Sequence, residues 1–282
     1  MKHILFILVL FNLTCGHIHA QVRLFDAPRL PKDTLDYSRI RCLYEQSVLS
    51  DTLISHKQTK SIMYLQIGNE ISKYMSFINF QTDSLISDDI RKGNNINLLE
   101  AIKNGRYQMG SDHILLFKNF PKYKNTVGNR IVYDSYIYEE DIVTPKWKIE
   151  KEQVTILGYS CTKATTRFCG RNYTVWFSPD IPVSEGPWKF TGLPGLILRV
   201  HDDKGEVTFE CTQIQNVGWS DPILKSVSNP QTIKTTKKKF YDQLKKYCDN
   251  PSGFIENNTR VTSTAPKRIL PKKMYNPIEL FE

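Results

Sequence analysis

The sequence predicts a mainly β fold of the α+β class, with a curved antiparallel sheet, half-barrel-like in shape, and a few covering helices. Most apolar residues occur in short runs that alternate with polar residues, which is typical of strands packed on one face. Short turns rich in glycine, asparagine and aspartate separate many of these runs, and such turns favour antiparallel neighbours. Helical patterns are confined to two regions, near residues 80–104 and 234–248. A closed barrel or a sandwich is the alternative architecture.

Residues 1–20 have the pattern of a secretory signal peptide. A short basic start is followed by apolar residues 4–13, and the segment ends at the small residue Ala20. The apolar run is far shorter than the roughly 18 residues that span a bilayer. We therefore expect export, with a mature chain that begins at Gln21. Cys15 offers a lipoprotein alternative, which is less favoured because a hydrophobic residue is lacking three positions before it.

The pattern of the remaining chain indicates one β-rich domain over residues 37–250 between two extended segments. Residues 21–36 and 251–282 are rich in proline and lack a clear period, so we expect an extended leader and an extended C-terminal tail. The first expected elements are a strand at 37–53, a hairpin of 60–67 and 70–79 over Gly68-Asn69, and two short helices within 80–104, the first of them capped near Asp83. Strands at 112–119, 129–138 and 148–156 come next, with a turn at Gly128-Asn129. A hairpin of 159–168 and 173–177, a strand pair of 196–201 and 207–215, and a helix at 234–248 complete the domain.

A long connection between the strands that contain Trp176 and Val200 is the most distinctive stretch of the chain. Its prolines restrict φ and its glycines permit tight bends, so we expect a stiff and specific path. Its apolar side chains argue against disorder, and we expect the loop to fold over the sheet and bury them. The residues to which we assign a binding or structural role are Trp176, Pro179, Asp180, Ile181, Pro182, Gly186, Pro187, Trp188, Phe190, Gly192, Leu193, Pro194, Gly195 and Leu196.

Two interpretations of this loop stay open from the sequence. In the first, it is an architectural corner, in which Leu193 is held extended by the following proline and Gly195 occupies a position suited to glycine alone. In the second, its aromatic side chains and the concave face of the sheet form an apolar groove, because aromatic residues are favoured anchors in binding sites.

The run Gly192-Leu193-Pro194-Gly195-Leu196-Ile197 resembles the hexapeptide that names the GLPGLI family of secreted Bacteroidota proteins. The flanking residues 178–182 and 186–187, and the preceding run 156–164, also resemble that family. The resemblance is specific over about residues 154–217 and looser back to about residue 36. It implies export to the periplasm or cell envelope of a Gram-negative bacterium. It implies no activity, because the function of the family is not established. The strand-rich pattern also looks like the half-open sheets of periplasmic lipoprotein carriers, although a shared fold does not transfer function.

An exported chain can form disulfides, and five cysteines follow Cys15. Because five is odd, at least one thiol is expected to stay unpaired or to pair between molecules. The cysteines and histidines lack the spacing of a zinc site, so we expect no metal. Buried free thiols and one structural bridge are both consistent with the spacing; a bridge would join Cys161 to Cys169 or to Cys211.

The net charge of +9 raises the question of an anionic partner. Basic residues are concentrated near the C-terminal end, but no recognised nucleic-acid motif accompanies them, so we expect no nucleic-acid binding. A solvated helix face, or weak contact with an anionic membrane surface, explains the lysines more simply. The residues concerned are Lys234, Lys237, Lys238, Lys239, Lys245 and Lys246.

The sequence contains no recognisable catalytic set and no cofactor motif. Ser160 lacks the second glycine of a nucleophile elbow, and His113 and His201 lie beside aspartates that are more simply solvated strand ends. The leading hypothesis is a monomeric, non-enzymatic binding or carrier protein for a hydrophobic ligand, a peptide or an envelope protein. The alternatives are an envelope hydrolase with a site assembled from distant residues, and an accessory subunit of an outer-membrane machine.

Overall fold

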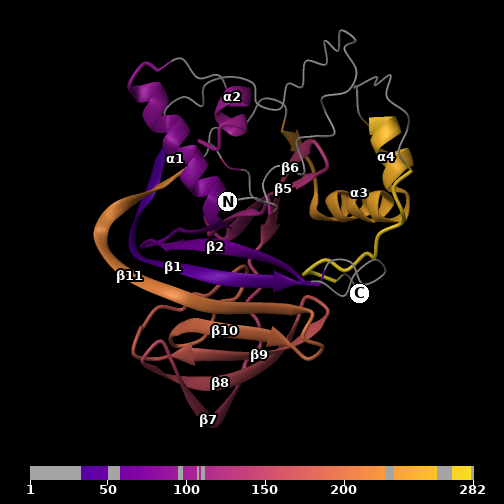
Figure 1. Cartoon of the computed structure of the whole chain (residues 1–282). Helices are drawn as coiled ribbons and strands as arrows, with labels where there is room; N and C mark the ends of the chain where they lie inside the picture. Colours follow the sequence, from indigo (N-terminus) through magenta and orange to yellow (C-terminus); the bar gives the residue numbers. More distant parts are fainter. Residues whose placement is uncertain are drawn as a thin grey trace.

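The computed structural model describes residues 33–49, 58–94, 98–106, 108, 112–225, 232–258 and 269–280. The expected signal peptide and almost all of the expected leader lie outside these residues. The mainly β class and the open antiparallel sheet are confirmed, since the described strands form one large sheet with four helices around it (Figure 1).

The sheet consists of two meanders that meet at its centre. Consecutive strands from β1 to β6 are neighbours, and so are consecutive strands from β7 to β11. The order across the sheet is β12-β6-β5-β4-β3-β2-β1-β11-β10-β9-β8-β7. The strands are β1 (Thr34–Val48), β2 (Thr59–Ile67), β3 (Ser72–Ser76), β4 (Leu115–Lys118), β5 (Lys124–Ile131), β6 (Asp134–Asp141), β7 (Lys148–Ile156), β8 (Tyr159–Phe168), β9 (Arg171–Ser178), β10 (Leu196–Asp202), β11 (Val207–Leu224) and β12 (Ile233–Lys234).

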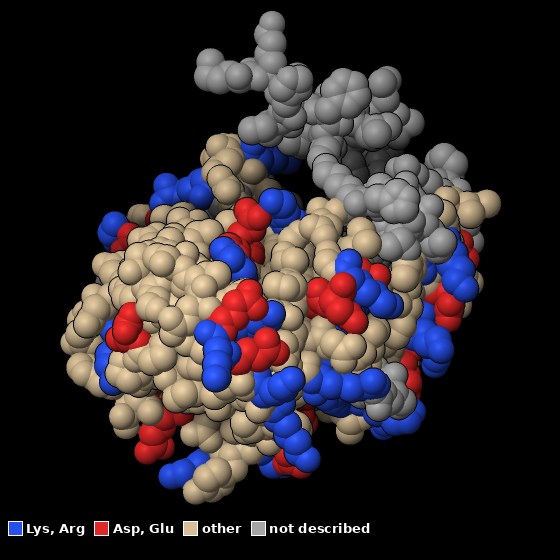
Figure 2. Space-filling view, turned by 90° about the horizontal axis from the view of Figure 1, so that it is seen from below, with Lys and Arg blue, Asp and Glu red and all other residues tan. Residues whose placement is uncertain are grey.

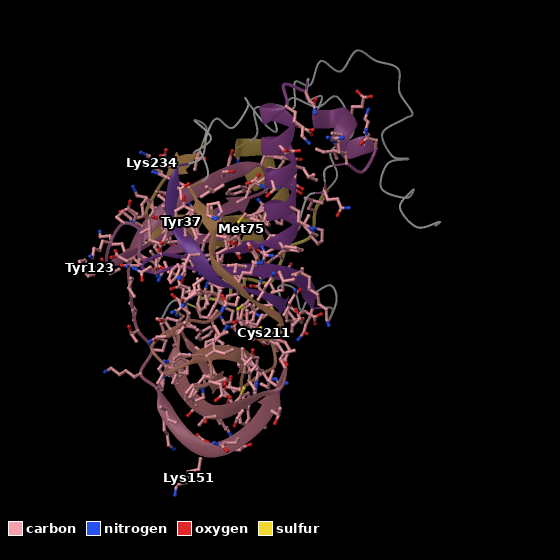
Figure 3. The ribbon with its side chains drawn as sticks, turned by 90° about the vertical axis from the view of Figure 1, so that its left-hand side faces the viewer. Tyr37, Met75, Tyr123, Lys151, Cys211 and Lys234 are labelled. Carbon is pink, nitrogen blue, oxygen red and sulfur yellow. The ribbon has the colours of Figure 1, made fainter. Side chains whose placement is uncertain are left out.

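The pairing of β1 with β11 joins the two meanders. It runs antiparallel from Thr34↔Leu224 to Val48↔Val207, which is the full length of β1. The other neighbours are also antiparallel, except for the short parallel contact of β12 with β6. The two edge strands lie at opposite ends of the sheet, as the labelled Lys151 of β7 and Lys234 of β12 show in Figure 3.

Alternation along each strand gives the sheet two distinct faces. The inner face carries the largest fully buried side chains, among them Tyr44, Tyr74 and Phe209. The outer face carries Tyr64, whose ring lies 4.5 Å from that of Phe80 in helix α1 (Phe77–Arg91). Helix α1 therefore covers the outer face at β2 and β3, and the short helix α2 (Leu98–Lys103) follows it.

Helix α3 (Lys237–Asp249) packs on the inner face at β5 and β6. It begins after Thr236, whose hydroxyl accepts a hydrogen bond from the N–H of Lys239 and so satisfies an otherwise unpaired helix amide. The buried Phe240 lies 5.7 Å from the rings of both Tyr136 and Tyr138. A charged helix is thereby fixed to the sheet through one aromatic side chain.

Several expected boundaries were wrong, each for a local reason. Gly128-Asn129 is not a turn but lies inside β5, and the turn is at Val132-Tyr133. The strand expected to reach residue 79 ends at Ser76, and the helix expected near Asp83 begins at Phe77. The tail expected from residue 251 begins instead with helix α4 (Pro251–Asn258), because proline is well suited to the first turn of a helix. Residues 269–280 form neither helix nor strand, and several of them are packed on the domain, among them Asn276 and Glu279.

Candidate functional site

The loop between β9 and β10 folds onto the inner face of the sheet and fills it. Trp188, Phe190 and Leu193 are at most 2% exposed. The ring of Phe190 lies at the centre of an aromatic group, 4.9 Å from Tyr173 and 6.0 Å from Phe209. Trp147, Phe168 and Trp188 complete this group. The apolar side chains that could have lined a groove therefore pack against one another and against the sheet.

Buried polar contacts fasten the loop to the opposite meander. Lys118 of β4 donates hydrogen bonds to the carboxylate of Glu185 at 2.7 Å and to the carbonyls of Gly186 and Phe190 at 2.7 and 3.2 Å. The hydroxyl of Ser72 donates to the other oxygen of Glu185 at 2.9 Å. Because Lys118 is almost completely buried, this ion pair has no competing water and fixes the position of the loop.

The two glycines of the hexapeptide are required for different reasons. Gly192 has a φ of +94°, a backbone conformation that residues other than glycine rarely adopt. Gly195 does not have a positive φ; a Cβ at this position would lie 2.2 Å from the carbonyl oxygen of Ser178. Gly195 is therefore needed for a close backbone approach between the loop and the end of β9.

The candidate loop residues divide into two groups. Trp176, Ile181, Gly186, Pro187, Trp188, Phe190, Leu193, Gly195 and Leu196 are buried, and Pro179, Asp180, Pro182, Gly192 and Pro194 are exposed. The structure thus brings the aromatic residues together as core. It does not bring them together as the lining of an open groove.

Four charged side chains lie together beside the loop, and no sequence pattern predicted them. We call them the buried charge cluster: Lys189 of the loop, Glu140 of β6, Lys237 of α3 and Glu279 of the C-terminal segment. Lys189 lies 2.5 Å from Glu140 and 2.6 Å from Glu279, and Lys237 pairs with the same two carboxylates. Burial alone raises the pKa of Glu279, but the two lysines lower it below its ordinary value. Four charges from four distant segments are therefore held in one desolvated place.

The segment of residues 269–280 is held by a second set of buried contacts around Arg171. This guanidinium pairs with Asp202 at 2.8 Å and Glu206 at 2.9 Å, and donates to the carbonyls of Pro277 and Ile278 at 3.0 and 3.2 Å. Burial alone raises the pKa of Glu206, but hydrogen bonds from Arg171 and Asn276 lower it overall. The C-terminal segment is therefore an integral part of the domain.

All five described cysteines are free thiols, so neither Cys161–Cys169 nor Cys161–Cys211 is bridged in this structure. Cys211 has Cys42 as a close neighbour, and a hydrogen bond between the two thiols, followed by burial, raises the pKa of Cys42. The Sγ of Cys169 lies 3.5 Å from Glu279, and burial followed by the charge of Glu279 raises the pKa of this thiol to about 12. The thiols of Cys42 and Cys169 are therefore protonated and unreactive near neutral pH.

An exposed group of three side chains lies on the outer face where β1 meets β11. We call Tyr37, Arg39 and Trp219 the outer aromatic patch. Residues between Asn216 and Asp221 bulge out of β11 opposite Arg39, so that Trp219 projects with a φ of +66°. Trp219 is 45% exposed and Tyr37 50% exposed.

The cation of Arg39 helps to hold the patch in place. Its guanidinium carbon lies 5.7 Å from the centre of the Trp219 ring, within the range of a cation–π interaction. Its Nε is buried and has no hydrogen-bond partner among the described residues. The patch therefore combines two half-exposed aromatic rings with an unused buried donor.

The polar groups singled out from the sequence do not assemble into a metal site. Within the described ranges, no group of three or more His, Cys, Asp and Glu side chains is placed to hold an ion. His113 accepts a hydrogen bond from Arg130 at 2.7 Å, and burial followed by the charge of Arg130 lowers its pKa to about 4. His56 lies outside the described residues.

The described surface includes an open polar pocket and has a mixed distribution of charge. The pocket has a volume of about 400 Å³ and lies at the ends of β7, β8 and β9, where Lys148, Arg167 and Asp203 are part of its wall. Seen from below in Figure 2, lysine and arginine side chains are interspersed with aspartate and glutamate side chains. This face therefore carries no extended field of a single sign.

A family model described as a protein of unknown function (Porph_ging) matches residues 168–199, from the end of β8 into β10. The match is short and includes the GLPGLI hexapeptide, and the family is one of the Bacteroidota. The comparison with curated proteins found no match. No helix among the described residues is long and apolar enough to cross a membrane.

Two solved structures are similar to part of the chain. They are described as "Structure of PNGF-II in P21 space group" and "Structure of PNGF-II in C2 space group", each with 15% identity and a TM-score of 0.43. The alignments cover 73% and 72% of this chain, and this chain spans 32% of the length of each of those.

Proposed function

We propose that this chain is an exported, non-enzymatic binding protein of the cell envelope that recognises a partner protein or peptide through the outer aromatic patch. The observation that carries the proposal is the projection of Trp219 from the β11 bulge beside Arg39 and Tyr37. Bulges re-aim side chains and are frequent beside functional sites.

The composition of the patch favours a protein or peptide partner. Tryptophan, tyrosine and arginine are the residues most enriched among those that dominate interface energies. Trp219 and Arg39 are already stacked, so less side-chain freedom is lost when a partner binds. Since the patch stands on two paired strands, its geometry is set before binding.

The inner face supports an enclosed hydrophobic ligand less well. The loop that could have lined a carrier groove is packed against the sheet, and Phe190 and Leu193 are almost completely buried there. A ligand on that face would have to displace the loop and break the ion pair of Lys118 with Glu185. The outer face requires no such rearrangement.

Site-specific photo-cross-linking tests the proposal. A benzophenone amino acid at Tyr37 in the exported protein is expected to capture a partner in envelope extracts, and the same probe at Tyr133 serves as a control. Tyr133 is 61% exposed but lies on the turn between β5 and β6. Adding Trp219→Ala to the Tyr37 probe is expected to reduce capture about tenfold, the effect of losing one dominant side chain.

Two outcomes would contradict the proposal. One is equal capture from Tyr37 and Tyr133, and the other is capture from Tyr37 that Trp219→Ala leaves unchanged. A circular dichroism spectrum of each variant shows that the fold is retained, which the exposure of Trp219 leads us to expect.

A further inference from the structure

The buried charge cluster places an amine against two carboxylates in a setting suited to covalent chemistry. The side chains of Lys189, Glu140 and Glu279 are 6%, 9% and 4% exposed. The ring of Trp188 lies 5.3 Å from the Lys189 nitrogen, and the hydroxyl of Tyr241 donates to Glu279 at 3.2 Å. The lysine nitrogen is thus held beside a carboxyl group, with the second carboxylate in contact and water largely excluded.

We propose that Lys189 and Glu279 become joined by an intramolecular isopeptide bond. The bond would connect the β9–β10 loop to the C-terminal segment, two parts of the chain separated by 90 residues. The two groups are already in contact, since the Nζ of Lys189 lies 2.6 Å from an oxygen of Glu279. Where the fold also aligns the nitrogen with the carboxyl carbon, the effective concentration reaches about 10⁵ M or more over free reactants.

The condensation balances without an external reagent. The Lys189 ammonium passes one proton through Glu140 to one oxygen of Glu279, which becomes a neutral carboxyl group. The amine lone pair then attacks the carboxyl carbon, and the electron pair of the C=O bond moves onto the carbonyl oxygen. A second proton moves from the nitrogen through Glu140 to the hydroxyl oxygen, and the C=O bond forms again. The carbon–oxygen bond breaks, one water molecule leaves, and the amide nitrogen keeps one hydrogen.

Other members of the cluster stabilise the charge that develops on Glu279. The Tyr241 hydroxyl and the Lys237 ammonium both contact its oxygens, where negative charge accumulates in the tetrahedral intermediate. Glu140 is in ion-pair contact with Lys189, and neither of its buried oxygens has a hydrogen-bond partner among the described residues, so both are open to take a proton and act as the shuttle. After reaction the Lys237–Glu140 ion pair remains, 3.0 Å apart, so the charge of the site stays balanced.

The bond also removes two costly buried charges. Four ionised groups in a desolvated site carry a large desolvation penalty, which their mutual attraction only partly offsets. Formation of the amide replaces one lysine and one glutamate by a neutral group that can keep the hydrogen bond of Tyr241. Burial of the cluster therefore favours formation of the amide over the two separate charges.

Mass spectrometry of the exported full-length protein, unfolded in denaturant, tests the proposal. The intact chain is expected to be lighter by one water molecule than its mature sequence. Tryptic digestion should yield a linked peptide that contains both Lys189 and Glu279, with no cleavage after Lys189. The linked peptide is the decisive observation, because a lower intact mass alone can also result from side reactions that remove water or ammonia. An unmodified mass together with cleavage after Lys189 would overturn the inference.

Matched variants assign the roles within the site. Lys189→Arg keeps the charge but cannot form the amide, and Glu140→Gln keeps the shape but cannot shuttle protons, so both should show the unmodified mass. Lys238→Arg is the matched control, because this lysine is exposed on the same helix and pairs with Asp242 outside the cluster, and it should retain the link. If Glu140→Gln fails to fold, the wild-type linked peptide still decides the proposal; if the variant folds and is linked, the role of Glu140 is wrong.

Discussion

His113 shows how burial at a single residue makes stability depend on pH. Its imidazole is half-buried beside Arg130, which donates a hydrogen bond to it at 2.7 Å. Burial, and then the nearby positive charge, lower its pKa from about 6.5 to about 4. The neutral ring is therefore the form that fits the folded protein.

The free energy of unfolding should fall as the pH is lowered from about 6.5 to about 5. In this window the unfolded chain binds a proton at His113, whose ordinary pKa is about 6.5, while the folded protein does not. His113→Gln removes this difference and should flatten the dependence. Urea denaturation at several pH values measures it, and an unchanged slope in the variant would show that His113 does not contribute.

The sequence predicted the burial of apolar side chains. It did not predict the burial of charged side chains that form ion pairs with one another. The loop was expected to fold over the sheet and bury its own aromatic side chains, and Trp188 and Phe190 are buried. Lys189 lies between them and is also buried, but it was not singled out from the sequence. Its partners Glu140 and Glu279 lie 49 and 90 residues away, so no local pattern could reveal the cluster.

At the scale of elements, the corner that leads into β10 depends on the missing side chain of Gly195. The backbone of Ser178 lies so close that a methyl group has no space. The architectural interpretation of the hexapeptide is thus explained by the close approach of Gly195 to the Ser178 backbone, and not by a positive φ at Gly195.

Gly195→Ala should lower the free energy of unfolding by about 1–3 kcal/mol, because β9 and the loop must separate to admit the methyl group. Gly128→Ala is the matched control: this glycine also lies in a strand, and its added Cβ would make an ordinary contact with Leu115. Leu193→Ala should cost about 2–5 kcal/mol, since that side chain is fully buried. Chemical denaturation compares the three variants, and equal stability of Gly195→Ala and wild type would refute the steric argument.

Strands that end at clear turn signals, such as Gly158 and Gly170, were predicted well, and irregular elements were not. The expected ranges for β7 and β8 are those observed. Strand β11 was expected to end at residue 215 but continues to Leu224, because the bulge at Trp219 interrupts its alternation. Helix α4 was missed because Pro251 and Gly253 indicate a turn when only the sequence is considered.

At the scale of the whole molecule, the loop connects the two meanders through the ion pair of Lys118 with Glu185. The sequence predicted a curved antiparallel sheet, but not that its last long strand would pair with its first. Nor could it predict that the loop would reach β3 and β4. Both depend on contacts between residues far apart in the chain.

Lys118→Met should destabilise the protein by about 3–5 kcal/mol, because it leaves the Glu185 carboxylate buried without its cation. The double variant Lys118→Met, Glu185→Leu should recover part of this loss, since neither charge is then stranded. Recovery is partial because the carbonyls of Gly186 and Phe190 still lack their donor. Losses that simply add in the double variant would show that the two side chains are not coupled.

The central pairing of β1 with β11 has a consequence for the order in which the protein can fold. β1 ends at Val48 and β11 begins at Val207. At about 5–20 residues per second, a ribosome reaches the first residue of β11 roughly 8–30 seconds after β1 itself has been made. During that time one edge of β1 has no strand to pair with, and the two halves of the sheet cannot join. The complete sheet can therefore form only late in synthesis. Until then, the pairing of β1 with β11 at the centre of the sheet is missing.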